Sequence, residues 1–131
     1  MIVTPFDPVG ALILVEGRVV GPLGPRRLDL VLDTGAVETI LALGVLDDLG
    51  YGAREAESLS SVSSIVGREY GYRIRVREFE ALGYAFADFE VAAHDFPDGF
   101  GIDGLLGLSF LRRFNYEIRS KHGEIHVAPV A

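Results

Sequence analysis

The stretch that decides the fold is LVLDTGA, Leu30–Ala36, in which an apolar run leads directly into Asp-Thr-Gly. The residues before the tripeptide, Arg27–Leu32, have the character of a strand. A carboxylate at the end of a hydrophobic strand is costly unless it is hydrogen-bonded or protonated. Gly35 lets the backbone come close and offer its N–H to that carboxylate, and the Thr34 hydroxyl can bond to neighbouring backbone. The segment is therefore predicted to hold one acid, Asp33, in a rigid loop.

Asp-Thr-Gly alone is weak evidence, because it arises by chance in roughly a few per cent of chains of this length. Taken alone, Asp33 can equally be the first residue of an Asx-turn at a strand end. A second element raises the significance of the first. About 70 residues further on, Ile102–Phe110 (IDGLLGLSF) is another apolar stretch interrupted by glycine.

The rest of the chain consists of short apolar runs separated by glycine and proline, as in turn-rich β proteins. Ala11–Val20 and Arg27–Leu32 are predicted to form a hairpin about Gly21–Pro25. In Tyr72–Phe79 the arginines Arg73, Arg75 and Arg77 alternate with apolar residues, as in a strand with one wet face. Further strands are predicted at Ala85–Ala92, Phe114–Ile118 and Glu124–Val127, the last two as a closing hairpin around Lys121-His122-Gly123.

Two segments have the apolar spacing of short helices: Leu41–Leu49, which ends before Gly50, and Gly104–Arg113. Asp103 precedes the second of these, and its carboxylate is predicted to cap that helix rather than to act as a second catalytic acid. Residues 56–66 are rich in serine and give no clear pattern, and Arg68–Gly71 is interpreted as a hairpin turn.

Composition limits the remaining possibilities. The chain of 131 residues is long enough for one core, so residues 1–131 are expected to form a single domain. It has no cysteine, which excludes disulfides and a Cys-based zinc site, and its histidines have no metal-binding spacing. The net charge of −7 argues against binding to nucleic acid. No stretch resembles a signal peptide or a membrane span, so a soluble, cytoplasmic protein is expected.

Together the two glycine-containing elements resemble those of a known family. Asp33-Thr34-Gly35-Ala36, preceded by Leu30-Val31-Leu32, resembles the active-site loop of the retropepsin-like aspartic proteases. Leu105-Leu106-Gly107, followed by Leu108–Leu111, resembles the hydrophobic-hydrophobic-Gly element and short helix that pack behind that loop. The spacing and the closing hairpin match single-domain bacterial and retroviral members, and the resemblance covers about residues 11–128.

The resemblance implies an all-β fold, a mostly antiparallel closed barrel with one or two short helices, active as a homodimer on peptide or protein substrates. Asp33 would be the catalytic acid, and the Thr34 hydroxyl would interlock the loops of the two subunits. Gly35 and Ala36 would shape the loop. The family's chemistry uses neither a cofactor nor a metal.

A flap is implied at the hairpin around residues 66–72, where Val66, Gly67, Gly71 and Tyr72 resemble flap residues of the viral enzymes. The sequence departs from the family at Val37, where a polar residue is usual, and the flap stretch holds fewer glycines. The arginine stripe on Tyr72–Phe79 can be a solvated face or a flap surface that favours acidic peptides.

Two identical acids would explain the chemistry, because carboxylates about 3 Å apart cannot both ionise cheaply and so share one proton. One would activate a water while the other protonates the scissile carbonyl. Two alternatives stay open at this stage. The fold can serve as a non-catalytic peptide-binding or dimerisation module, or the chain can pair with a different Asp-Thr-Gly subunit.

Overall fold

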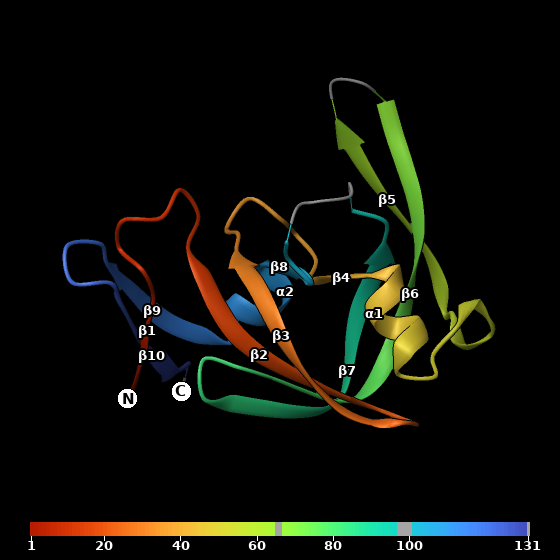
Figure 1. Cartoon of the computed structure of the whole chain (residues 1–131), viewed down its shortest axis with the longest axis horizontal. Helices are drawn as coiled ribbons and strands as arrows, with labels where there is room; N and C mark the ends of the chain where they lie inside the picture. The colour runs from red at the N-terminus through yellow and green to blue at the C-terminus, as the bar shows by residue number, and fades with distance from the viewer. Residues whose placement is uncertain (65–66, 97–100, 131) are drawn as a thin grey trace.

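The computed structural model describes residues 1–64, 67–96 and 101–130, and their side chains except those of 62–64 and 67–69. Strands account for most of the described chain (Figure 1). They are β1 (Ile2–Pro5), β2 (Leu14–Gly21), β3 (Gly24–Leu32), β4 (Ile40–Ala42), β5 (Ser58–Ser64), β6 (Gly67–Ala81), β7 (Tyr84–His94), β8 (Gly104–Leu106), β9 (Phe114–Arg119) and β10 (Glu124–Pro129). The helical elements are α1 (Leu43–Asp48), the single 3-10 turn η1 (Ala53–Glu55) and α2 (Leu108–Leu111).

Six strands close into a barrel. They follow the order β2, β3, β8, β4, β7 and β6, and β6 pairs again with β2 to complete the ring. The pairs β3–β8 and β4–β7 are parallel and the other pairs of the ring are antiparallel. The predicted fold class, a mostly antiparallel closed barrel with two short helices, is therefore confirmed.

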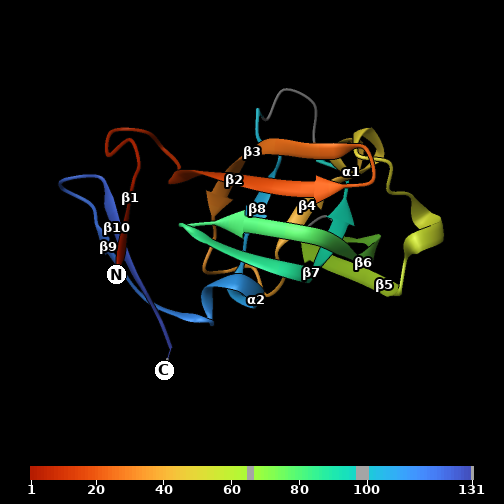
Figure 2. The same cartoon turned by 90° about the horizontal axis from the view of Figure 1, so that it is seen from below.

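Two parts of the chain lie outside the ring. Strand β5 pairs with β6 alone, and the two strands project from the barrel (Figure 1). Strands β1, β10 and β9 form a separate antiparallel sheet that lies to one side of the barrel (Figure 2). The predicted hairpin of β9 and β10 is confirmed, and β1 adds the N-terminus to it.

The barrel interior follows the strand alternation. On β6, Ile74 and Val76 are buried, and Arg75 between them is exposed. Three aromatic rings fill the centre, with Phe110 of α2 meeting Phe79 and Phe89 edge-on at centroid distances of 5.6 and 5.9 Å. This packing fixes α2 against the core.

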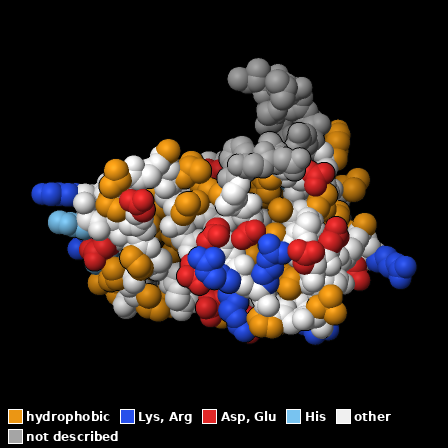
Figure 3. Space-filling view, viewed as in Figure 1, with side chains coloured by type: hydrophobic (Ala, Val, Ile, Leu, Met, Phe, Trp, Pro, Cys, Tyr) orange, Lys and Arg blue, Asp and Glu red, His pale blue; other side chains and the backbone are white. Residues whose placement is uncertain are grey.

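The outer face of β2 and β3 carries charges of both signs (Figure 3). Arg27 lies 2.9 Å from both Glu16 and Asp29, and Arg18 lies 3.4 Å from Glu78. These pairs are exposed and contribute little to stability. Positive and negative side chains alternate there, so neither sign forms a patch of its own on this face.

The helix predicted at Gly104–Arg113 is wrong over its first half. Gly104–Leu106 is strand β8, which inserts between β3 and β4, and only Leu108–Leu111 is helical. A short buried apolar run has no periodicity that distinguishes a strand from a helix. Here the run is a strand because β3 and β4 on either side of it offer main-chain groups for pairing. Likewise, the helix predicted from Leu41 begins at Leu43, because Ile40–Ala42 pairs with β7 and β8.

The predicted turn at Arg68–Gly71 is also wrong. Ser64 pairs with Gly67, and residues 68–71 lie inside β6, where they pair with β5. The serine-rich segment contributes β5. Within the described ranges, no helix is long and apolar enough to cross a membrane.

Candidate active site

The loop that follows β3 holds Asp33 by main-chain contacts. The N–H of Asp33 donates to the Leu106 carbonyl at 3.0 Å, and the Gly35 N–H donates to Asp33 Oδ1 at 2.9 Å. The Ala36 N–H closes the turn on the Asp33 carbonyl at 3.2 Å. The Asp33 side chain is half-buried, while Thr34 is exposed. Locally this is an Asx-turn, so only its surroundings can give the carboxylate a further role.

Strand β8 and helix α2 support the loop from behind. Leu108 and Ser109 donate their N–H groups to the carbonyls of Ala36 and Val37, at 2.8 and 2.9 Å. Gly107 lies so close that a Cβ there would stand 2.1 Å from the Glu38 carbonyl oxygen and 2.8 Å from that of Ala36. The backbone angles of Gly107 are extended (φ −101°, ψ −172°), so the position requires glycine for space.

A hydrogen-bonded pair of hydroxyls, from the buried Thr39 and the exposed Ser109, completes this support. Thr39 is fully buried, and its Oγ1 accepts from the Gly107 N–H at 3.3 Å and from the Ser109 hydroxyl at 3.0 Å. Ser109 Oγ in turn accepts from the Thr39 N–H at 2.9 Å. The loop and the element behind it are thus joined on both main chain and side chain.

A cavity of about 380 Å³ opens beside Asp33. Its walls are apolar at Ala36, Val37, Ile40 and Leu105, and its polar lining comes from Asp33, Glu38 and Ser61, with Gly35 between them. Sites for small ligands and side chains are concave, mostly apolar and equipped with few polar groups. The cavity can hold an apolar side chain while a polar group of the same ligand meets Asp33.

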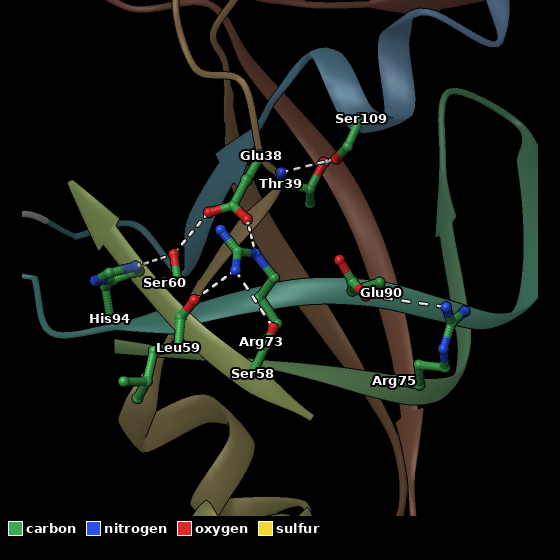
Figure 4. A network of polar contacts seen from close by, with 10 residues as sticks. All are labelled: Glu38, Thr39, Ser58, Leu59, Ser60, Arg73, Arg75, Glu90, His94 and Ser109. Carbon is green, nitrogen blue, oxygen red and sulfur yellow. Dashed lines mark hydrogen bonds and ion pairs between the residues drawn. The ribbon is translucent and has the colours of Figure 1, made fainter. Parts of the chain in front are cut away.

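A polar cluster lies behind this cavity, and we call it the Glu38 cluster: Glu38, Ser60, Arg73 and His94 (Figure 4). Arg73 donates from Nε to Glu38 Oε1, and the Ser60 hydroxyl donates to Oε2 at 2.6 Å. His94 Nε2 lies 2.9 Å from Ser60 Oγ. Because the single Ser60 proton is directed to the carboxylate, His94 Nε2 must be the donor to the Ser60 oxygen.

The cluster sets the charge of Glu38. Burial raises the pKa of this carboxyl, but hydrogen bonds from Ser60 and Arg73 and the charge of Arg73 outweigh it. The net result is a pKa below the ordinary value of 4.5, so Glu38 is ionised at neutral pH. Arg73 also bonds to the Ser58 hydroxyl at 3.3 Å and to the Leu59 carbonyl.

Despite its residue types, the cluster is not a hydrolytic triad. In a triad the acid orients the histidine, and the serine gives its proton to that histidine. Here the Ser60 proton goes to Glu38, and Ser60 is 1% exposed, out of reach of a substrate. The sequence pattern indicated none of the contacts among these four residues.

The arginine stripe is largely neutralised within the chain. Arg73 pairs with Glu38, and Arg75 lies 3.3 Å from Glu57 and 3.9 Å from Glu90. A flap surface selective for acidic peptides would need uncompensated positive charge. These contacts support the other interpretation of the stripe, a solvated face.

Asp103 does not cap a helix, because its carboxylate accepts from the Asp29 N–H at 2.8 Å and lies 3.3 Å from Arg26. Gly107, not Asp103, precedes α2. Asp103 lies beside Asp29, and Asp29 comes four residues before Asp33. Four residues of extended strand span roughly 13 Å. It is therefore not brought together with Asp33.

Of the residues expected in a flap, Gly67, Gly71 and Tyr72 lie on β6, and Val66 lies outside the described residues. A Cβ on Gly71 would stand 1.9 Å from the Ala93 carbonyl oxygen. Gly71 is therefore required where β6 leaves β7.

Comparisons with known proteins agree with this geometry. A family model described as aspartyl protease matches residues 15–110. Among solved structures, the chain is similar to a retropepsin-like aspartic protease from Rickettsia conorii, with a TM-score of 0.71 and 18% identity. That match covers 96% of this chain and 88% of the Rickettsia chain. No curated protein matches in sequence. The chain belongs to the aspartyl protease family and has a retropepsin-like fold.

Proposed function

We propose that the chain is an aspartic endopeptidase subunit in which Asp33 acts with Asp33 of a second copy. The observation that carries the proposal is the half-buried Asp33 carboxylate, held by main-chain contacts at the edge of a mostly apolar cavity. The chain places one acid in this loop, and the chemistry of an aspartic protease needs two. A homodimer supplies the second acid without any other residue.

In the proposed mechanism the paired carboxylates share one proton, because two negative charges in contact are unfavourable. The ionised acid takes a proton from a water that attacks the scissile carbonyl, while the protonated acid donates to the carbonyl oxygen. No covalent intermediate forms. Activity is then greatest at the pH where the pair holds one proton, and the two apparent pKa values belong to the pair.

The substrate is an extended peptide with an apolar side chain next to the cleaved bond. The apolar walls at Ala36, Val37, Ile40 and Leu105 favour such a side chain. Extended peptides gain main-chain hydrogen bonds from neighbouring strands and present alternate side chains to pockets. In this proposal the projecting strands β5 and β6 would take part in binding, and Thr34 would contact the partner's loop.

The direct test is Asp33→Asn, measured by cleavage of a peptide library from acid to neutral pH. The variant is expected to keep its fold and to lose cleavage altogether. Asp29→Asn, on the same strand at an exposed ion pair with Arg27, is the matched control and should cut normally. Cleavage by Asp33→Asn would refute the proposal. Failure of the native protein to cut any peptide would favour a non-catalytic binding module.

Mixing the native chain with Asp33→Asn tests whether each subunit contributes one acid. If the subunits exchange freely, only native–native dimers are active, so activity falls as the square of the native fraction. A linear fall would mean that each chain works alone. Sedimentation of the pure protein adds the assembly state, because a chain that needs a different partner would sediment as a monomer.

A further inference from the structure

The chemistry proposed for Asp33 does not require the Glu38 cluster. Ser60 and His94 are 1% and 4% exposed, and burying polar groups costs free energy unless hydrogen bonds replace those to water. Apolar residues of similar size would fill the same space at a lower cost in free energy. The cluster is therefore of interest for what its contacts join.

The cluster joins the catalytic loop to a strand that is otherwise weakly held. Strand β5 lies outside the closed ring and pairs only with β6. The pairing of β6 with β7 begins at Tyr72 and Ala93, so residues 67–71 of β6 pair with β5 alone. These two strands project from the barrel (Figure 1). Arg73 and His94 lie where the projection begins.

The contacts of the cluster cross this point. Ser60 of β5 bonds to Glu38, which comes two residues after Ala36 and lines the cavity beside Asp33. Arg73 of β6 holds the same carboxylate and also the main chain of β5 at Leu59. Ser61, the next residue on β5, forms part of the cavity lining. One ionised carboxylate thus ties both projecting strands to the segment that carries Asp33 (Figure 4).

We propose that Glu38, Ser60, Arg73 and His94 form a latch that positions β5 at the edge of the cavity beside Asp33. Ser60 and Arg73 act through strand position and are positioning residues, not catalytic ones. The consequence for peptide binding rests on the proposed protease function. The position of β5 does not, and it can be measured in protein without activity.

The structural test uses spin labels on Leu23→Cys and Tyr70→Cys in the Asp33→Asn background. Both positions are exposed, at 75% and 69%, and the chain has no other cysteine. Labelled protein is diluted into a large excess of unlabelled chain so that only distances within one subunit are recorded. The unmodified latch is expected to give one narrow distance distribution, and Ser60→Ala to give a broad one.

If Ser60→Ala folds poorly, Arg73→Ala tests the latch in its place. The Arg73 side chain is 31% exposed, so its removal leaves no buried cavity. Arg75→Ala is its matched control, two residues along the same strand with ion pairs to Glu57 and Glu90 that do not reach the loop. Broadening in Arg73→Ala but not in Arg75→Ala supports the latch. Distributions of native width in both Ser60→Ala and Arg73→Ala would overturn it.

Kinetics provide the second measurement, on a peptide that the native protein cuts. Loss of one hydrogen bond to a charged group corresponds to about tenfold in an equilibrium constant. Ser60→Ala is therefore expected to raise KM about tenfold and to change kcat less than about threefold. A fall in kcat at unchanged KM would refute a positioning role. If the native protein cuts no peptide, the protease proposal fails, and the spin-label distances still decide the latch.

Discussion

The Asp33 loop and the β5–β6 projection lie on either side of the same cavity, and they are held in different ways. The loop at residues 33–39 is fixed chiefly by main-chain hydrogen bonds to β8 and α2 and by the close approach of Gly107. The projection is fixed by its ladder and by the Glu38 cluster, in which Ser60 and Arg73 bond to Glu38 and His94 bonds to Ser60.

The difference shows which part of the site is rigid and which part can adapt. Main-chain contacts over a glycine have almost no freedom to rearrange, which suits the proposed role of Asp33, since two carboxylates of a dyad would have to meet within a fraction of an ångström. Side-chain contacts can break singly and reform, which suits a strand that has to accommodate a peptide. Each prediction below perturbs one side of this comparison.

The largest effect is expected for Gly107→Ala, which places a Cβ 2.1 Å from the Glu38 carbonyl oxygen. Neither main chain can yield, so the substitution should cost more than about 4 kcal/mol in the free energy of unfolding. Gly44→Ala is the control, since no heavy atom lies within 4 Å of its added methyl group. In helix α1 that change should stabilise by about 0.5 to 1 kcal/mol. Denaturant unfolding measures both, and a tolerated Gly107→Ala would show that the loop is adaptable after all.

A smaller loss is expected for Thr39→Val, which keeps the shape of the side chain and removes its hydroxyl. The buried Gly107 N–H would then lose its acceptor, as would the Ser109 hydroxyl, which can turn to solvent because Ser109 is exposed. Leaving such groups unsatisfied costs about 1 to 3 kcal/mol, and we expect about 2 kcal/mol in denaturant unfolding. Thr4→Val on strand β1 is the control and should change the stability by less than about 0.5 kcal/mol. Equal effects would mean that the hydroxyl pair does not fasten the loop.

The two regions also differ in how far the sequence predicts them. The loop and its support could be recognised because their requirements are local: an acid, a glycine for close approach, and an apolar run that ends in glycine. Strands of the barrel could be predicted from alternation, as at Ile74 and Val76, whereas the closed barrel itself was implied by the family resemblance. Periodicity could not show that Gly104–Leu106 is a strand, because the vacant ladder between β3 and β4 decides this.

The Glu38 cluster could not be predicted from the sequence. Its hydrogen bonds join pairs of residues that are 22, 34 and 35 positions apart in the chain, and the residues come from four different segments. Glu38 belongs to no motif in the sequence, and Arg73 is one of three similar arginines on a strand. Which arginine of the stripe is half-buried depends on where β6 leaves β7, and that is a property of the assembled barrel. Asp103 was misassigned for the same reason, since its partners Arg26 and Asp29 belong to a distant strand.

The smallest effect is expected for Glu38→Gln, which tests how the stability contributed by the Glu38 cluster depends on pH. Because the folded-state pKa of Glu38 lies below 4.5, its ionised contacts stabilise the native protein above that pH and are lost as the pH falls through the lower folded value. The native chain should exceed Glu38→Gln by about 1 kcal/mol at neutral pH, and the gap should close in acid below pH 4.5. Glu90→Gln, at the exposed pair with Arg75, should cost less than about 0.5 kcal/mol at neutral pH.

Thermal unfolding at a series of pH values measures this gap. A gap that widens in acid would mean that Glu38 is stabilised in its protonated form, and the ionic account of the cluster would be wrong. A gap that closes as expected means that the Glu38 cluster stabilises the fold through an ionised carboxylate at neutral pH and loses that contribution in acid. The two sides of the cavity would then be held by different chemistry, the projection through the charge of Glu38 and the loop chiefly through main-chain hydrogen bonds.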